Sequence, residues 1–261
     1  MRIAIAIPHS APQFDKEFVF SLLLLTEGFH LWNRDKDHKL KLFINSQGFA
    51  GIADMREKLA EEAIGEGYEY ILWLDSDMKV PPGIIPKMLA WFEEHKDLEA
   101  VSGLYHWKKQ PFIPHVYMFK KDEARFVPMA AFPLKQAFNV DGVGYGCLMI
   151  KTSVYARIEK PWFDFSPGEY GEDLYFFAKA YPINMICDPR IACNHLMQTN
   201  VSIGNYLEYN NLKVNKKVNI QITKEQVEKI DKENADNNRG GAKKMAKRSF
   251  PKKLIDKIRK K

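Results

Sequence analysis

Residues 70–78 read Tyr70-Ile71-Leu72-Trp73-Leu74-Asp75-Ser76-Asp77-Met78. Five apolar residues run without interruption and are followed by two acids with one serine between them. A short continuous apolar run is typical of a strand that is buried on both faces, as in a parallel sheet. Ligands bind where the carboxyl ends of such strands open into a crevice. The pattern therefore predicts that Asp75 and Asp77 lie at a ligand-binding edge.

The two acids are suited to a divalent cation. Side chains two residues apart on a strand share a face, so we expect the carboxylates of Asp75 and Asp77 to lie side by side. An ion such as Mg²⁺ or Mn²⁺, itself bridged to substrate phosphates, would offset their repulsion. The alternative is that both acids only begin the next turn, because Asp is common at loop starts and helix N-caps.

The composition describes a globular chain with an excess of positive charge. Of the 261 residues, 46% are hydrophobic, which is enough for one sizeable core. The net charge of +6 suggests anionic partners, such as nucleotide phosphates, nucleic acid or a lipid surface. Cys147, Cys187 and Cys193 match no zinc spacing and are typical of buried thiols in a reduced compartment.

The sequence shows no segment typical of secretion or membrane insertion. Its first residues do not resemble a signal peptide, because the apolar run is short and polar residues follow at once. The longest apolar run, near Phe18 to Leu25, is too short to span a bilayer. We therefore expect a cytoplasmic protein, with peripheral contact at a membrane surface as the alternative.

Strands and helices are predicted to alternate through the first 105 residues. The predicted strands are Ile3 to Ile7, Leu40 to Asn45, residues 70–74, and Leu98 to Tyr105. The predicted helices are Phe14 to Trp32, Asp54 to Ile64, and Ile84 to His95. This order implies an α/β fold with a doubly wound, mainly parallel sheet. The helix over Phe14 to Trp32 is apolar on more than one side, so we expect it to be largely covered.

The alternation then gives way to a small antiparallel portion. Its predicted elements are a hairpin of Val116 to Phe119 and Arg125 to Val127, a strand Cys147 to Lys151, a helix Leu174 to Tyr181, and short strands Ile183 to Cys187 and Arg190 to His195. A glycine-rich loop that contains Asp141, Gly142 and Gly144 precedes a strand, whereas a dinucleotide-binding loop follows one. We interpret it as backbone that must come close to a ligand.

Several polar residues each have a functional and a structural interpretation. His9 either faces a bound nucleotide or lines the turn after Pro8. Arg56 either pairs with a nucleotide diphosphate or is a solvated arginine on a helix flank. Glu172 and Asp173 either do chemistry or only favour a helix N-terminus through its dipole. His195 is either a metal ligand or a hydrogen-bonded strand histidine.

Together these features resemble family 2 glycosyltransferases of the GT-A fold. The resemblance rests on Pro8-His9, Arg56, Asp75-Ser76-Asp77, the glycine loop, Glu172-Asp173 and His195, in the expected order. It implies a sugar-nucleotide donor bound by Pro8, His9, Arg56, Asp75, Ser76 and Asp77.

The resemblance also implies a metal site and a base. By this resemblance, Asp77 and His195 are the expected protein ligands of Mn²⁺ or Mg²⁺, and Asp75 is expected near the nucleoside or the metal. Asp173, beside Glu172, is the expected general base of an inverting transfer. Asp141, Gly142 and Gly144 are placed on the acceptor side. The membrane helices and the Gln-x-x-Arg-Trp motif of processive synthases are absent from this sequence, which favours the addition of single sugars.

The chain changes character after residue 200. We predict a GT-A-like catalytic domain over residues 1–200, and a polar linker with a basic, partly helical tail over residues 201–261. Lys243 to Lys261 carry ten Lys and Arg against one acid. Such a tail either contacts an anionic membrane or nucleic acid, or is only solvated. The acceptor is correspondingly a glycan, a lipid-linked molecule or a nucleic acid.

Two other classes of protein fit the same residues. A metal-dependent nucleotidyl or phosphoryl transferase also uses paired acids at a strand end, but it releases no free nucleoside diphosphate. An inactive nucleic-acid-binding or membrane-binding protein with the same fold would bind its ligand without turning it over.

Overall fold

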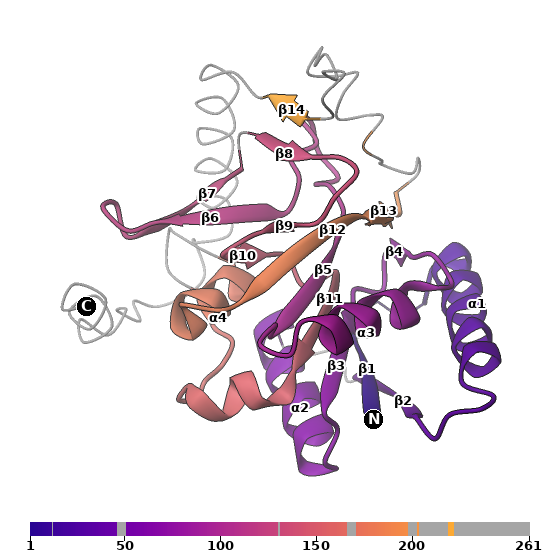
Figure 1. Ribbon diagram of the computed structural model, residues 1–261. Coiled ribbons are helices and arrows are strands. Elements are labelled where there is room, and N and C mark those ends of the chain that lie inside the picture. The colour runs from indigo at the N-terminus through magenta and orange to yellow at the C-terminus, as the bar shows by residue number, and fades with distance from the viewer. Residues whose placement is uncertain are drawn as a thin grey trace.

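A seven-stranded sheet forms the centre of the protein, and helices cover both of its faces (Figure 1). The computed structural model describes residues 1–11, 13–45, 51–129, 131–165, 171–197, 203 and 219–221. The strand order in the sheet is β2-β1-β3-β11-β5-β12-β9. Five strands are parallel: β1 Arg2–Pro8, β2 Lys39–Asn45, β3 Tyr70–Leu74, β5 Ala100–Leu104 and β12 Met185–Ala192. The predicted mixed α/β fold with a mainly parallel sheet is confirmed.

The two remaining strands of this sheet, β11 Cys147–Lys151 and β9 Phe138–Asn139, run antiparallel to their neighbours. Side chains alternate between the two faces, as the pleat of a strand requires. In β1, Ile3, Ile5 and Ile7 join one apolar cluster while Ala4 and Ala6 join the other. Both faces of the sheet are thus buried, which explains the continuous apolar runs in the sequence.

The helices divide between these faces. Helices α1 Lys16–Trp32 and α3 Ile84–Glu94 contribute to the first cluster. Helices α2 Ile52–Gly65 and α4 Glu172–Ala180, with the 3₁₀ helix η1 Thr152–Arg157, contribute to the second. Helix α2 begins at Ile52, two residues before the predicted start at Asp54, and residues 46–50 lie outside the described part of the chain.

Helix α1 departs from the prediction that it would be largely covered. Its inner face buries Phe18, Ser21, Leu25 and Phe29, and it packs against α3 and β4. The opposite face carries Phe20 at 59% and Leu23 at 61% exposure. The physical reason is position: α1 lies at the side of the sheet (Figure 1), where one layer of neighbours reaches it.

Three small sheets complete the fold. Strands β6 Val116–Lys120 and β7 Arg125–Pro128 form the predicted hairpin, which β10 Gly142–Val143 extends. Strand β4 Met78–Lys79 pairs with β13 Asn194–His195, and β8 Ala131–Pro133 pairs with β14 Asn219–Gln221. Because β14 belongs to the predicted linker, at least this part of residues 201–261 contacts the body of the protein. Lys243 to Lys261 lie outside the described residues, and the boundary at residue 200 stays a prediction.

The strands before residue 200 also differ from the prediction. Two short strands were expected on either side of Pro189, but one strand, β12, runs through the proline, and only Asn194–His195 of the second expected strand form a separate strand, β13. Its pairing with β5 shifts register between Asp188 and Ala192, which accommodates the proline. The three cysteines are buried, as predicted. Within the described part of the chain, none of the helices combines the length and apolar character needed to cross a membrane.

Candidate active site

The predicted site residues gather at the carboxyl edge of the central sheet. Strands β1 and β3 are parallel neighbours, with Ala6 opposite Trp73, so Pro8 and Asp75 arrive at the same edge. His9 is buried, and its ring stacks on Phe14 with 3.6 Å between the ring centroids. Burial lowers the pKa of His9, which favours the neutral ring. His9 therefore lines the turn, and a role toward a nucleotide stays a prediction.

The Asp75-Ser76-Asp77 segment is a turn and not the continuation of a strand. Strand β3 ends at Leu74, and the Met78 amide donates to the Asp75 carbonyl at 3.0 Å. The expectation that Asp75 and Asp77 share a strand face is therefore wrong, because the backbone bends between them. The two carboxylates have separate partners instead.

Asp75 belongs to a group that we call the Arg56 cluster, made of Arg56, Asp75 and Glu172. Arg56 Nη2 donates to Asp75 Oδ1 at 2.8 Å, and Arg56 Nε donates to Glu172 Oε1 at 3.2 Å. The Arg56 side chain is 3% exposed. Burial alone would lower the pKa of Arg56, but the two carboxylates outweigh it and raise the pKa. The interpretation of Arg56 as a solvated arginine is wrong.

The Arg56 cluster joins residues that are distant in the sequence. Arg56 and Glu172 are separated by 116 positions. The guanidinium of Arg56 also lies 5.2 Å from the centroid of the Tyr145 ring and 5.6 Å from that of Trp73. Its Nη1 is buried without a hydrogen-bond partner among the described residues. The cluster thus holds the Asp75 turn against the first turn of α4, and Arg56 Nη1 is left as a hydrogen-bond donor that neither carboxylate uses.

Asp173 lies next to Glu172 in the first turn of α4. Its Oδ1 accepts a hydrogen bond from the Leu174 amide at 2.8 Å, so it does take part in the helix start. Burial and the neighbouring Glu172 carboxylate raise the pKa of Asp173 to about 7, although the Leu174 amide and Arg56 oppose this rise. A carboxylate with a pKa near neutrality can accept a proton at physiological pH.

The second acid of the turn belongs to what we call the Asp77 site, made of Asp77, His195 and Lys108. Pairing of β4 with β13 brings His195 beside the turn, with 3.9 Å between His195 Nε2 and Asp77 Oδ1. The His195 ring is buried and its Nδ1 donates to the His106 carbonyl at 2.5 Å. Because a carbonyl can only accept, Nδ1 carries the proton and Nε2 keeps its lone pair.

The Asp77 site fits a divalent cation in its chemistry. Burial lowers the pKa of His195, although Asp77 and the His106 carbonyl oppose this, and a neutral imidazole is the form that binds metals. Asp77 Oδ1 is buried without a hydrogen-bond partner among the described residues. No group of three His, Cys, Asp or Glu side chains that could hold a metal occurs in that part of the chain. Two ligands suffice for Mg²⁺ or Mn²⁺ only if substrate phosphates and water fill the other positions.

The glycine loop has a different explanation from the one predicted. A Cβ on Gly144 would lie 2.0 Å from the Tyr105 hydroxyl, and one on Gly142 would lie 2.9 Å from side-chain atoms of Leu174 and Phe126. The Tyr105 hydroxyl also accepts from the Gly146 amide at 2.9 Å. The backbone thus comes close to the protein's own side chains, so these glycines require no ligand.

Asp141 is also occupied within the protein. Its Oδ2 accepts from the Phe119 amide at 2.8 Å, which ties the loop to strand β6. Ser76 lies half-buried in the turn between the two acids. An acceptor-side role for Asp141, Gly142 and Gly144 stays a prediction.

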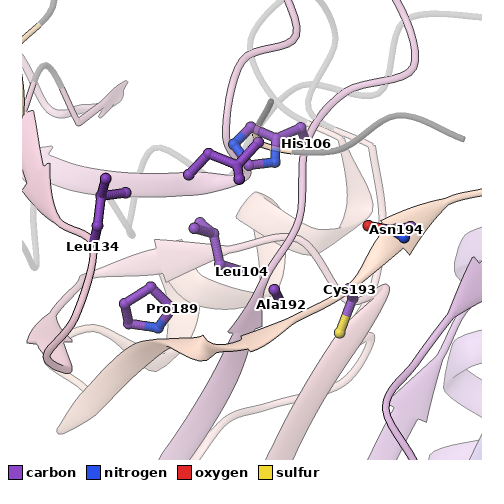
Figure 2. A pocket seen from close by; sticks show the side chains of 8 residues that line it. Leu104, His106, Leu134, Pro189, Ala192, Cys193 and Asn194 are labelled. Carbon is purple, nitrogen blue, oxygen red and sulfur yellow. The ribbon is translucent and has the colours of Figure 1, made fainter. Parts of the chain in front are cut away.

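A pocket of about 320 Å³ adjoins the Asp77 site (Figure 2). It is lined by the carboxyl-terminal ends of β5 and β12 and by the residues around them: Leu104, His106, Leu134, Pro189, Ala192, Cys193, Asn194 and Ile203. Its lining is mostly apolar, and His106 connects it to the site because the carbonyl of that residue holds His195. The pocket thus lies beside His106 and Asn194, which adjoin His195 through a hydrogen bond and through the chain.

The sequence did not predict a role in the site for residues 105–108, because Tyr105 was assigned only to the end of a predicted strand and the next three residues to no element. Tyr105 supports the glycine loop, His106 orients His195, and Lys108 Nζ makes an ion pair with Asp77 Oδ2. Their position in the sequence could have predicted this role, because they follow β5, whose carboxyl end lies at the same edge of the sheet as that of β3.

A family model described as glycosyl transferase family 2 matches residues 27–158, a range that includes Arg56, Asp75 and Asp77. No curated protein sequence matches the chain significantly.

Three solved structures are similar to this chain at low sequence identity, and only the first of them has a TM-score above 0.5. A197 from STIV is 20% identical with a TM-score of 0.51, covering 85% of this chain and 95% of its own. S. aureus TarS 1–349 in complex with UDP-GlcNAc is 16% identical with a TM-score of 0.44, covering 80% and 64%. The catalytic domain of Drosophila β1,4-galactosyltransferase 7, in complex with xylobiose, is 12% identical with a TM-score of 0.40, covering 98% and 79%.

The family match is the decisive comparison, because it spans 132 of the 261 residues and includes Asp75 and Asp77, whereas Glu172 and Asp173 lie outside the matched range. On this evidence the chain belongs to glycosyl transferase family 2 and is a glycosyltransferase.

Proposed function

We propose that this glycosyltransferase moves a single sugar, with inversion, from a nucleoside-diphosphate sugar to an acceptor hydroxyl and depends on Mn²⁺ or Mg²⁺. The observation that carries the proposal is the meeting of three acidic residues at one sheet edge. Asp75, Asp77 and Asp173 come from two segments and differ in their surroundings. Asp75 is paired with Arg56, Asp77 has one carboxylate oxygen without a hydrogen-bond partner among the described residues, and Asp173 has a raised pKa. These are the parts that transfer from a sugar nucleotide requires.

Asp77 and His195 are the residues that would hold the metal. Asp77 Oδ1 and His195 Nε2 both have free acceptor capacity and are 3.9 Å apart. When bound, the cation would neutralise charge on the departing diphosphate. Asp75 has its Oδ1 committed to Arg56, so we place it next to the donor and outside the metal's ligands.

Asp173 is the proposed general base. The acceptor oxygen attacks the anomeric carbon, the bond from that carbon to the phosphate oxygen breaks, and the acceptor proton passes to the Asp173 carboxylate. The nucleoside diphosphate leaves with the electron pair. Because attack and departure occur on opposite sides of the sugar, the configuration inverts. A pKa near 7 leaves a substantial fraction of Asp173 deprotonated at neutral pH and still basic enough to accept the proton.

Arg56 gives the site its shape. Without Arg56, the carboxylates of Asp75 and Glu172 would repel each other, and their negative charge next to Asp173 would no longer be offset. Its Nη1 has no protein partner among the described residues, so it could donate to a donor phosphate without breaking either ion pair.

The experiment is a donor panel. The purified protein is incubated with Mn²⁺ and uridine, guanosine, adenosine, cytidine and thymidine diphosphate sugars, and released nucleoside diphosphate is measured with and without EDTA. We expect slow release from at least one donor, abolished by EDTA. Release of nucleoside monophosphate or pyrophosphate would instead favour a nucleotidyl or phosphoryl transferase, and no release from any donor would contradict the proposal.

A further inference from the structure

We propose that Lys108 is a diphosphate-binding residue that competes with the metal for Asp77. In the free protein its ammonium neutralises Asp77, and when donor and metal bind it turns to the donor's diphosphate. This inference rests on the proposed function, because it assigns a further residue to the same site.

The first observation is how the two oxygens of Asp77 are used. Lys108 Nζ contacts Oδ2, while Oδ1 is buried and faces His195 Nε2. One carboxylate is thus shared between a protein cation and the position that we assign to a metal. Two positive charges on one carboxylate repel each other, so a bound Mn²⁺ would weaken the hold of Lys108 on Oδ2.

The second observation is that the Lys108 contact can be exchanged at little cost. The side chain of Lys108 is 34% exposed and that of Asp77 is 42% exposed. Ion pairs with this exposure contribute little to stability. The Arg56 cluster differs in this respect, because its arginine is 3% exposed and anchored by two carboxylates.

The third observation is that Lys108 projects from a loop with an ordered base. His106 and Pro114 form a β-bridge, the Trp107 amide donates to the Ile113 carbonyl at 2.8 Å, and the His115 amide donates to the Tyr105 carbonyl at 3.1 Å. The base of the loop therefore fixes the Cα of Lys108 next to the site. Only the flexible lysine stem has to move for its ammonium to leave Asp77.

A diphosphate is the ligand that this arrangement favours. The ammonium group is a compact point charge with three donors, which suits phosphate oxygens. A donor diphosphate bridged to a cation at Asp77 would be the nearest anion once Oδ2 is released. Lys108 would then share with the metal the charge that develops on the leaving group.

The test uses Lys108→Gln in the full chain, with Lys109→Gln as the matched control. Lys109 is adjacent and exposed and carries the same charge, so it reports the effect of net charge alone. The first probe is Mn²⁺ alone, measured by the loss of its free-ion EPR signal. We expect Lys108→Gln to bind Mn²⁺ about three- to ten-fold more tightly than wild type, because the competing ammonium is gone.

The second probe is pyrophosphate, measured by calorimetry with Mn²⁺ at a concentration that saturates each protein. Here Lys108→Gln should bind about ten-fold more weakly, and Lys108→Arg should stay within a few-fold of wild type because it keeps the charge. Opposite changes for the two probes, with Lys109→Gln like wild type, are the result that supports the inference.

Three outcomes would overturn it: neither probe changes in Lys108→Gln, Lys109→Gln changes equally, or wild type and Lys108→Gln both fail to bind Mn²⁺. These readouts are separate from the donor panel. An enzyme that releases nucleoside diphosphate while Lys108→Gln behaves as wild type refutes the role of Lys108 alone. Opposite changes without turnover of any donor refute the proposed function alone.

Discussion

The Arg56 cluster and the Asp77 site lie at the same sheet edge, yet one is complete and the other is not. In the Arg56 cluster a buried guanidinium bonds two carboxylates within the protein. In the Asp77 site a half-exposed carboxylate has one oxygen on a lysine and the other without a hydrogen-bond partner in the described structure. The comparison separates residues that are paired within the protein from residues whose proposed partner is a ligand, although the sequence shows both kinds only as acidic residues at the end of a strand or the start of a helix.

The largest expected effect is on the complete region. Arg56→Met leaves Asp75 and Glu172 without their shared cation, and breaking a buried ion pair costs about 3–5 kcal/mol. We expect the free energy of unfolding, measured by urea titration, to fall by that amount. The control is Lys41→Met, which breaks the exposed pair with Glu66 and should cost less than about 1 kcal/mol. An equal decrease in the free energy of unfolding in both variants would show that the Arg56 cluster contributes no more to stability than an exposed ion pair does.

Asp77→Ala should have the opposite profile. Its ion pair is exposed and its second oxygen is unsatisfied, so the free energy of unfolding should change by less than about 1 kcal/mol. Metal-dependent release of nucleoside diphosphate should nevertheless be abolished. Ser76→Ala, one residue away, is the control for the turn itself. Unchanged Mn²⁺-dependent turnover in Asp77→Ala would remove Asp77 from the metal site.

Asp173 lies beside the Arg56 cluster, next to Glu172, and its substitution should separate binding from chemistry. Asp173→Asn keeps the size and the helix start but removes the proton acceptor, so transfer should fall by about two to four orders of magnitude with donor binding near normal. Product formation and donor affinity are measured separately. Transfer within a few-fold of wild type would return Asp173 to a helix-capping role.

The raised pKa of Asp173 also predicts a pH dependence. The base works only when deprotonated, so transfer should fall about ten-fold per pH unit below its pKa of about 7 and level off above it. The folded protein binds this proton more tightly than the unfolded chain does. The stability that Asp173 contributes is therefore present below its ordinary pKa of 3.8 and is lost as pH rises through about 7. Flat rate and stability profiles over this range would contradict the assignment.

The smallest expected effect is that of His195→Ala. The variant removes one of two proposed ligands, while Asp77 and the donor's phosphates keep theirs, so the Mn²⁺ concentration for half-maximal transfer should rise about ten-fold. His95→Ala, an exposed histidine on another surface, controls for general loss of imidazole. Superimposable metal titrations for His195→Ala and wild type would count against His195 as a ligand.

The difference between the two regions also explains what the sequence could predict. Strand β3 has the predicted bounds because a continuous apolar run with an acidic stop has one simple interpretation. The covering of α1 could not be predicted, because its sequence is apolar around most of its circumference and only its place beside the sheet exposes one face. Pro189 suggested a break that β12 absorbs through a register shift.

Contacts between distant segments were the least predictable. The sequence did not decide between a paired and a solvated Arg56, because one of its partners, Glu172, lies 116 residues away. Lys108 carried no signal of its own, because a lysine in a loop is normally solvated, and only the fold brings it onto Asp77, 31 residues away. The residue types and their order predicted the location of the site, whereas the partners of each carboxylate required the structure.

The most direct test of the account is to locate the cation. Crystals of the protein soaked with Mn²⁺, alone and with pyrophosphate, are measured at a wavelength where manganese scatters anomalously. We predict one anomalous peak between Asp77 and His195, stronger with pyrophosphate, and none at the Arg56 cluster. A peak between Asp75 and Glu172, or no peak at Asp77 under either condition, would contradict the division between a complete and a waiting region.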